Sequence, residues 1–292
     1  MKKIFAIALI ISFFLLTNTV ESSEEINNSI IYISASGAAN FTKIQNGIDA
    51  ADPGDTIFVY NGTYFENLVI DKSIILIGEN KESTIIDGRV VGNTIKVNAD
   101  YVTIENFTIT HSGLIFPLSG INLSSNHNII ENNLITDNYY GLTVYFSHEN
   151  IISGNIIQND DSCGIYISNS KNNSIFNNTI KNNYFNGVGL YDSSDNNIIE
   201  NNNFINNGFC GVNIRVSSGN KVINNNFSDN NIGIHIPSYS NIEENNTFSD
   251  NKIDVEREFI SSETLLILIF IFAVIIGLLV VVFFCYVRKK RK

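Results

Sequence analysis

The middle of the chain repeats a short pattern of apolar and polar positions. A glycine followed by an apolar-x-apolar triplet recurs every 21 to 24 residues, at Gly120, Gly141, Gly164, Gly187, Gly211 and Gly233. Most copies continue as Asn-x-apolar-x-x-Asn-x-apolar, for example NSIFNNTI at residues 173–180. A period of this length, built from short alternating pieces without a helix-length stretch, predicts a solenoid.

Three short apolar pieces and their bends fit one turn of a right-handed, three-sheeted parallel β-helix, an all-β fold. Leucine-rich repeats have a similar period, but their frame is leucine, whereas isoleucine dominates here. Successive turns of a β-helix lie about 4.8 Å apart, so equivalent residues should form columns. We expect apolar columns that begin at Ile121, Leu123, Ile130 and Ile135 and that fill the interior.

Asparagine is unfavourable in helices and strands, yet it recurs at fixed places in each turn. Its backbone tolerates the left-handed conformation that tight bends need. Its side-chain amide can also bond the amide of the next turn, as in stacked sheets. The sequence therefore predicts two asparagine columns at the bends, which begin at Asn128 and Asn133.

Both ends of such a solenoid need a cover, since an open coil exposes unpaired backbone groups. Residues 41–51 have helical spacing, with one apolar face made of Phe41, Ile44, Ile48 and Ala51. Pro53-Gly54 then stops the helix, which predicts a short N-terminal capping helix. At the other end, Glu243 occupies an apolar position and indicates a fading last coil.

The β-helix domain is expected over residues 23–262, with its regular coils at 120–248. A basic start and an apolar run are typical of a signal peptide over residues 1–22. Residues 264–287 are apolar and long enough to predict a transmembrane helix. The basic tail 288–292 should then be cytoplasmic, which makes the chain a single-pass membrane protein with its domain extracellular or periplasmic.

The exported part is strongly acidic. It holds all 29 acidic residues and 11 of the 18 basic ones, which gives 11 − 29 = −18. Such a surface repels nucleic acid, so no nucleic-acid partner is expected. The partners that the sequence favours are the membrane and polysaccharide or envelope components.

One outer sheet face gathers residues suited to sugars. The second and fourth positions after the coil glycines should point to solvent. Those positions include Tyr145, Tyr166, Tyr191, Arg215 and His235. Aromatic rings and planar hydrogen-bonding groups suit saccharides, although tyrosine also favours strands for its own sake. The stretch 111–119 is longer than later bends, and it either walls a cleft or is an inert insertion.

Candidate catalytic and metal-binding residues are few. Asp160 and Asp161 are the adjacent acids of the regular coils, and paired acids suit glycoside chemistry. His127 and His148 follow their coil glycines at the same offset, so a pair about 5 Å apart is expected. Two histidines alone make a weak metal site. No cofactor is expected, apart from loosely bound Ca²⁺ or a copper ion.

Two cysteines fall within the coils. Cys163 and Cys210 each stand immediately before a coil glycine, two coils apart. That separation is about 9–10 Å, which exceeds the reach of a disulfide. The sequence therefore predicts two free thiols.

The stretch KIQNGIDAADPGDTIFVYNGTYFENLVIDKSIILIGE, with STIIDG after it, resembles the start of parallel β-helix proteins of the pectin-lyase-like class. The later coils resemble NosD-type repeats, also described as carbohydrate-binding and sugar-hydrolysis repeats. The resemblance covers about residues 30–250 and implies a scaffold and not a site. NosD proteins are exported and are linked to copper delivery for nitrous-oxide reductase. In general appearance the chain is also similar to surface proteins of methane-producing archaea.

Three functions stay open at this point. The first is a membrane-anchored cell-surface protein that binds glycans or serves an envelope or adhesion role without catalysis. The second is an exported polysaccharide lyase or glycoside hydrolase that uses Asp160 and Asp161. The third is a NosD-like role in copper or metal handling. Polygalacturonase-like enzymes of this fold carry Gly-His-Gly and Arg-Ile-Lys motifs, which this sequence lacks, and that favours the first function.

Overall fold

The computed structural model describes residues 28–237 and 240–257. The predicted signal peptide, transmembrane helix and basic tail lie outside these residues. Within the two described ranges, no helix is both long and apolar enough to cross a membrane.

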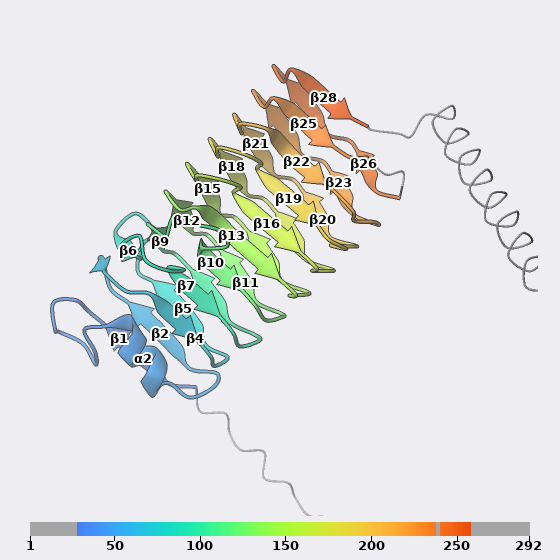
Figure 1. Ribbon diagram of the computed structural model, residues 1–292. Coiled ribbons are helices and arrows are strands. Elements are labelled where there is room, and N and C mark those ends of the chain that lie inside the picture. The colour runs from blue at the N-terminus through green and yellow to red at the C-terminus, as the bar shows by residue number, and fades with distance from the viewer. Residues whose placement is uncertain (1–27, 238–239, 258–292) are drawn as a thin grey trace, which may run out of the picture.

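The chain winds into a solenoid whose walls are three parallel sheets, here called A, B and C (Figure 1). Sheet A contains β1 (Ile30–Ile33), β2 (Thr56–Val59), β5 (Ile75–Gly78), β8 (Thr103–Glu105), β11 (Ile129–Glu131), β14 (Ile151–Ser153), β17 (Ser174–Phe176), β20 (Ile198–Glu200), β23 (Lys221–Ile223) and β26 (Ile242–Glu244). Sheet B contains β3 (Gly62–Tyr64), β6 (Thr84–Asp87), β9 (Thr108–Thr110), β12 (Leu134–Thr136), β15 (Ile156–Gln158), β18 (Thr179–Lys181), β21 (Asn203–Ile205), β24 (Asn226–Ser228) and β27 (Thr247–Ser249). Sheet C contains β4 (Leu68–Ile70), β7 (Ile95–Val97), β10 (Ser119–Leu123), β13 (Tyr140–Tyr145), β16 (Ile165–Ser168), β19 (Val188–Tyr191), β22 (Cys210–Ile214), β25 (Ile232–His235) and β28 (Ile253–Glu256).

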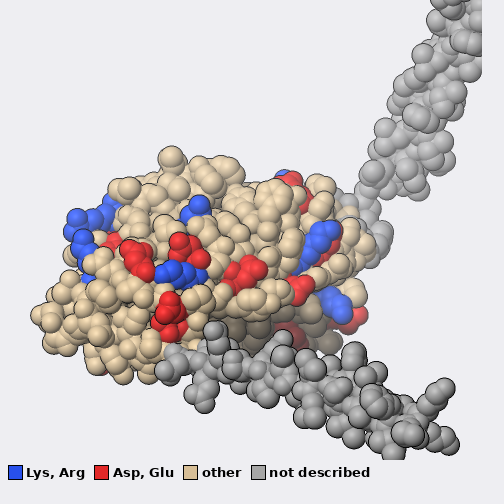
Figure 2. All heavy atoms as spheres, turned by 90° about the horizontal axis from the view of Figure 1, so that it is seen from below, with Lys and Arg blue, Asp and Glu red and all other residues tan. Residues whose placement is uncertain are grey.

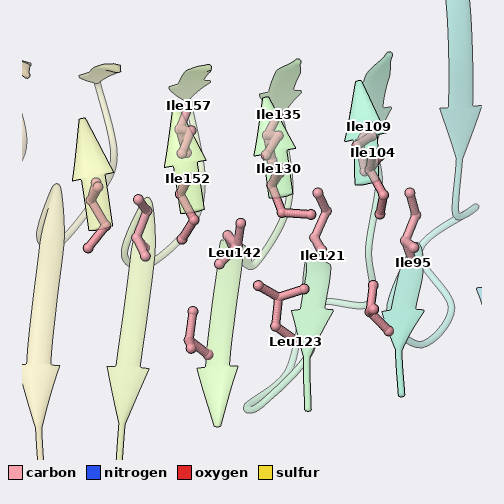
Figure 3. Close-up of a cluster of buried hydrophobic side chains, with 14 of the residues drawn as sticks. Ile95, Ile104, Ile109, Ile121, Leu123, Ile130, Ile135, Leu142, Ile152 and Ile157 are labelled. Carbon is pink, nitrogen blue, oxygen red and sulfur yellow. The ribbon is translucent and has the colours of Figure 1, made fainter. Parts of the chain in front are cut away.

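The apolar columns predicted from the repeat are confirmed. In sheet A, Ile130 pairs with Ile152, and Ile152 pairs with Ile175. In sheet B, Ile135 pairs with Ile157 in the same way. Side chains from all three sheets meet in the interior (Figure 3), where these isoleucines are fully buried. Because every inner coil is covered on both sides, each apolar side chain loses its contact with water.

Three amide ladders run along the corners of the solenoid, where the sequence predicted two. The C–A ladder contains Asn128, Asn150, Asn173, Asn197, Asn220 and Asn241. The A–B ladder contains Asn133, Asn155, Asn178, Asn202, Asn225 and Asn246. The third, the B–C ladder, contains Asn138, Asp160, Asn183, Asn207, Asn230 and Asn251.

Each ladder amide connects two coils. Asn173 is typical: its Oδ1 accepts hydrogen bonds from the backbone N–H and the Nδ2 of Asn150, both at 2.9 Å. Its own Nδ2 donates to Oδ1 of Asn197 at 3.0 Å and to the carbonyl oxygen of Ser147 at 3.1 Å. The buried amides of the ladders are therefore paired, which avoids the cost of an unsatisfied polar group.

The left-handed bend and the ladder fall on two different residues, not on one as the sequence suggested. Asn177 has a φ of 57°, and the ladder amide Asn178 follows it. The same order holds at Asn201, with a φ of 55°, before Asn202. This arrangement explains the Asn-Asn doublets of the sequence: the first asparagine adopts the left-handed conformation of the bend, and the second carries the buried ladder amide.

The predicted N-terminal cap is confirmed as α2 (Ile44–Ala50), which packs on β1, β2 and β4. Its expected face is buried at Ile44 and Ile48. The carboxylate of Glu66 accepts the N–H groups of Ile44 and Gln45 at 2.8 and 3.0 Å, so it neutralises the positive end of the helix. Lys72 covers the other end, because its Nζ donates to the carbonyl oxygen of Ala51 at 2.8 Å.

The last coil still forms β26, β27 and β28, but a charge enters its interior column. Glu243 pairs in register with Val222. Its carboxylate accepts from Nδ2 of Asn246 at 3.0 Å and forms an ion pair with Arg257 at 3.3 Å. A charged group at this position interrupts the apolar column, which disfavours further stacking on this end.

Charges are interspersed on the face that Figure 2 shows. Blue basic and red acidic side chains alternate there within a largely uncharged surface. The negative charge of the chain is therefore not gathered into one field on this face, and uncharged polar and apolar side chains make most of its contact surface.

Candidate functional site

The three tyrosines predicted on sheet C and a fourth, Tyr140, that the sequence did not single out form one cluster on the outside of that sheet, here called the tyrosine face. It consists of Tyr140, Tyr145, Tyr166 and Tyr191. The ring of Tyr166 is the centre, with ring centroids 5.1 Å from Tyr140, 5.6 Å from Tyr145 and 4.9 Å from Tyr191. The last pair is stacked at 23°. The three predicted tyrosines thus lie side by side as a continuous aromatic surface.

Small residues make room for these rings. Ser168 lies between Tyr145 and Tyr191 in the strand register, which leaves space for the ring of Tyr166. Gly189 is in register with Tyr166, and the ring of Tyr191 lies so close to it that an added Cβ would clash. The tyrosine face is therefore an alternation of large and small residues, fixed by the pleat of the sheet.

The long bend of residues 111–118 contacts this face. Phe116, 58% exposed, lies 6.2 Å from the ring of Tyr140 and 6.3 Å from that of Tyr166 between centroids, both edge-on. The insertion therefore packs against the tyrosine face, and whether it walls a cleft stays a prediction. It also adds an aromatic residue, Phe116, that the sequence did not single out.

The phenols of the face stay neutral over the physiological range. Burial raises the pKa of Tyr140 to about 12 and also raises the pKa values of Tyr145, Tyr166 and Tyr191. The hydroxyl oxygen of Tyr191 accepts a hydrogen bond from Nδ2 of Asn186 at 2.8 Å. The hydroxyl group of Tyr145 is buried, so the face presents mainly uncharged ring surfaces.

The remaining predicted residues of this face differ in access. Arg215 is exposed at the edge of sheet C. His235, in contrast, is 3% exposed, and its Nδ1 lies 2.8 Å from Oε2 of Glu256. Asn213, its neighbour in register, is 1% exposed, and its Oδ1 has no hydrogen-bond partner. The expectation that His235 points to solvent is therefore wrong: the residue is buried and contacts Glu256, its neighbour in register.

The proposed acid pair does not converge. Asp160 is fully buried as a member of the B–C ladder, whereas Asp161 is exposed. Oδ1 of Asp160 accepts the N–H of Asn138 at 3.0 Å, and its Oδ2 has no partner. Burial raises its pKa well above the usual range. Since one carboxyl group faces inward and the other outward, the two do not form a catalytic pair.

The two histidines occupy neighbouring columns, not the same one. The N–H of His148 bonds Oδ1 of Asn126, and the N–H of His127 bonds the carbonyl oxygen of His148. The sequence carries a signal for this difference: His127 stands one residue before its ladder asparagine and His148 two residues before its own, although both stand at the same distance from their coil glycines. His127 stacks on Tyr101 at 4.9 Å. Within residues 28–237 and 240–257, no three His, Cys, Asp or Glu side chains are grouped to hold a metal ion.

Cys163 and Cys210 are free thiols, as predicted. Asn186 lies between them: its Nδ2 donates to Sγ of Cys163 at 3.6 Å, and its Oδ1 accepts the N–H of Cys210 at 3.3 Å. Burial raises the pKa of Cys163 to about 11 and that of Cys210 to about 12. Buried, protonated thiols of this kind are unreactive packing residues.

A second acid pair arises from the strand register. Glu105 on β8 pairs directly with Glu131 on β11, so their side chains are neighbours on the outer face of sheet A. Burial and the charge of Glu131 raise the pKa of Glu105. The residues are far apart in sequence, and only their equal offset within consecutive coils gives a signal for them.

Solved structures share this fold. The alginate lyase from Paenibacillus sp. str. FPU-7 superimposes with a TM-score of 0.60 at 15% identity, covering 79% of this chain and 99% of that one. Pectate lyase Pel9A gives 0.59 at 15% identity, over 81% of this chain and 80% of that one. At these identities the similarity establishes the parallel β-helix fold alone.

Sequence comparison gives a relative and a family. A "Cell surface glycoprotein" of Methanothermus fervidus is 32% identical over 161 residues, which is 52% of this chain and 26% of the relative. The chain thus spans about a quarter of that relative's length. The family model described as "Periplasmic copper-binding protein (NosD)" matches residues 48–261. These residues include the coils and the amide ladders, and the chain therefore belongs to the NosD family of parallel β-helix proteins.

Proposed function

We propose that the protein is a cell-surface β-helix that binds saccharide on its tyrosine face, without catalysis. The observation that carries this proposal is the cluster around Tyr166, where three half-buried phenol rings and the exposed Phe116 pack with the buried Tyr140 into one aromatic surface. The apolar faces of sugar rings stack on such surfaces, and hydroxyl and guanidinium groups at the edge fix their orientation. Arg215 supplies an exposed guanidinium group there.

The location of the protein rests on the comparisons. The family is described as periplasmic, and the M. fervidus relative is named a cell surface glycoprotein. Both support an exported position, in agreement with the signal peptide and membrane anchor that the terminal sequences predict. A glycan partner in the envelope would be within reach of a domain held there.

A glycan array with the full-length chain tests the proposal. The chain is purified in a non-glycosidic detergent, because a sugar headgroup would compete for the face. Each ring–ligand contact contributes about 0.5–1.5 kcal/mol. The triple variant Tyr145→Ala/Tyr166→Ala/Tyr191→Ala should therefore bind at least about tenfold more weakly than the wild type.

The matched control is Tyr32→Ala, which removes a half-exposed tyrosine from sheet A, away from the tyrosine face. Circular dichroism and thermal unfolding verify that each variant keeps the β fold. A triple variant that binds every glycan of the array as tightly as the wild type would refute the proposal, and so would a loss that the control shares.

A second candidate, glycoside hydrolysis, is favoured by the Glu105–Glu131 pair. A carboxyl group with a raised pKa beside a second acid is the arrangement that glycoside hydrolases use. Release of reducing sugar from a polysaccharide panel, abolished in Glu105→Gln but not in the exposed Glu82→Gln, would favour this function over binding alone.

The family's name refers to copper, but the described part of the chain has no group of side chains suited to bind that metal. Copper sites use clustered imidazole and thiolate ligands. Here His127 and His148 lie in different columns, and Cys163 and Cys210 are buried on either side of Asn186. These residues do not fit a copper centre, and the proposed function does not use one.

A further inference from the structure

The corner between sheets B and C carries a second feature that the tyrosine face does not include. In three consecutive coils this bend is one residue longer than in its neighbours: Ile180 to Gly187 spans seven positions, whereas Phe227 to Gly233 spans six. The extra residue brings Tyr184 and Phe185 to the surface, with exposed fractions of 79% and 39%. Large aromatic residues at an exposed bend require an explanation.

These aromatic residues are held rigidly. The rings of Phe185 and Phe209, from adjacent coils, are stacked 5.1 Å apart at 6°. Their backbones are also joined, since the N–H of Phe209 donates to the carbonyl oxygen of Phe185 at 2.7 Å. Gly208 lies beneath Tyr184 so closely that any Cβ would clash with the carbonyl oxygen of Tyr184. A preformed surface of this kind loses little entropy when a ligand binds.

The aromatic residues line a hollow of about 550 Å³, together with the amides of Asn182 and Asn206. Nδ2 of Asn206 donates to Oδ1 of Asn182 at 2.9 Å, which fixes the two exposed amides relative to each other. Sugar-binding sites combine an aromatic surface with planar amide donors and acceptors. This hollow has both in fixed positions.

A second hollow, of about 360 Å³, continues the first along the solenoid axis. It shares Asn206 and Gly208 with the first and extends to Asp229, Asp250 and Lys252. Together the two hollows cross four coils, a length of about 14 Å at the usual strand spacing. We call this combined feature the bend groove. It is longer than a single sugar ring and suits an oligosaccharide.

The charge of the groove selects among saccharides. Among the described residues, no Asp, Glu, Lys, Arg or His lines the aromatic hollow, and two carboxylates oppose one ammonium group in the second. A polyuronate chain would therefore meet like charge and gain no cationic partner. We infer that the bend groove binds neutral oligosaccharides and discriminates against uronate polymers. This site extends the proposed saccharide-binding function, but it is separate from the tyrosine face.

The test measures binding of neutral and acidic oligosaccharides by isothermal titration calorimetry. The full-length chain, in non-glycosidic detergent, is titrated with cello-, manno- and xylo-oligosaccharides and with oligogalacturonate. We expect at least one neutral series to bind and oligogalacturonate not to bind. The double variant Phe185→Ala/Phe209→Ala should lower the neutral affinity at least tenfold, while the tyrosine-face triple variant should leave a groove-bound component.

A charge variant gives a second readout. Asp229→Asn/Asp250→Asn keeps the groove's shape and should raise the affinity for oligogalacturonate relative to the neutral series. The inference is overturned if no neutral oligosaccharide binds, or if the phenylalanine variant binds as the wild type does. If only the tyrosine triple variant lost all binding, saccharide would bind at the tyrosine face and not in the bend groove. If only the phenylalanine variant lost all binding, saccharide would bind in the bend groove and not at the tyrosine face.

Discussion

The A–B and B–C ladders have the same geometry but differ in one residue. The A–B ladder is asparagine throughout, from Asn133 to Asn246. The B–C ladder has Asp160 where the neighbouring coil has Asn183. In both, Oδ1 accepts a backbone N–H from the preceding coil. At Asp160, however, the second oxygen occupies the place of the amide nitrogen and has no partner.

This difference shows what the second polar atom of the side chain contributes. Nδ2 of Asn183 donates to Oδ1 of Asn207 at 3.0 Å, while its Oδ1 accepts the N–H of Asp160, so one amide bonds both the following and the preceding coil. An ionised carboxylate only accepts, whereas a protonated one has a single donor. A ladder with one aspartate should therefore be weaker at that coil, and its stability there should depend on pH. The all-asparagine ladder should show neither the weakening nor the pH dependence.

The largest effect is expected in the intact A–B ladder. Asn178→Ala would remove the acceptor of the Asn155 N–H, at 2.9 Å, and the donor to the carbonyl oxygen of Ile152, at 2.8 Å. Each buried polar group left unpaired costs about 1–3 kcal/mol. Urea denaturation should show a loss of about 3 kcal/mol or more in the free energy of unfolding.

The matched control for this change is the adjacent Asn177→Ala. That residue is exposed, with a φ of 57°, so only the left-handed backbone is affected, at a cost of about 1 kcal/mol. Equal losses in both variants would mean that the ladder bonds add no stability beyond the bend.

An opposite effect is expected at the odd position of the B–C ladder. Asp160→Asn would restore the amide nitrogen and pair the atom that now has no partner. The free energy of unfolding at pH 7 should rise by about 1–3 kcal/mol, the cost of one unpaired buried polar group. Asp161→Asn, at the exposed neighbour, serves as the control and should change stability by less than about 0.5 kcal/mol. A destabilised Asp160→Asn would contradict the ladder interpretation.

The pH dependence of stability should separate the two ladders further. Burial raises the pKa of Asp160 in the folded state, so the folded protein binds this proton more tightly than the unfolded chain. Protonation therefore favours folding, and this contribution is complete below the ordinary pKa of an aspartate and is lost as pH rises through the folded-state value. Asp55 and Asp195 have lowered pKa values and act in the opposite direction.

The informative quantity is thus the difference between wild type and Asp160→Asn. Urea titrations from pH 4 to pH 8 should show the advantage of the variant growing with pH. A difference that is flat over this range would mean that Asp160 does not change protonation on unfolding.

The smallest effect concerns the bends that the ladders do not support. Val216 has a φ of 51° and is 80% exposed, an unfavourable conformation for a β-branched residue. Val216→Gly should relieve about 1–2 kcal/mol of strain and lose about 0.5–1 kcal/mol to chain entropy, a net gain of up to about 1.5 kcal/mol. Asn196→Gly, at a φ of 58°, should gain less, because asparagine already tolerates this region.

Much of the fold was predictable because each coil interacts mainly with the next. Ile130, Ile152 and Ile175 lie in one column since they occupy equal places in consecutive repeats. The capping helix was equally clear from its apolar face. The candidate site was predictable in part: Tyr145, Tyr166 and Tyr191 do meet, but His235 is buried where the alternation of strand faces predicted access. The adjacency of Asp160 to Asp161 in sequence likewise gave no sign that Asp160 is buried.

The repeat in the sequence was enough to specify three walls, the interior columns and a row of aromatic side chains on one outer face, because short strands of constant period have few other ways to bury isoleucine. The partners of each polar group were settled only when the coils stacked. At a corner, two asparagines adjacent in sequence differ in role: one is exposed with a left-handed backbone, and the next is a buried ladder amide. A difference of one residue also places His127 and His148 in neighbouring columns. Likewise, the packing of Phe116 on Tyr166 and of Glu105 beside Glu131 joins residues from different coils. Such contacts depend on bend geometry and strand register, which composition and period leave undetermined.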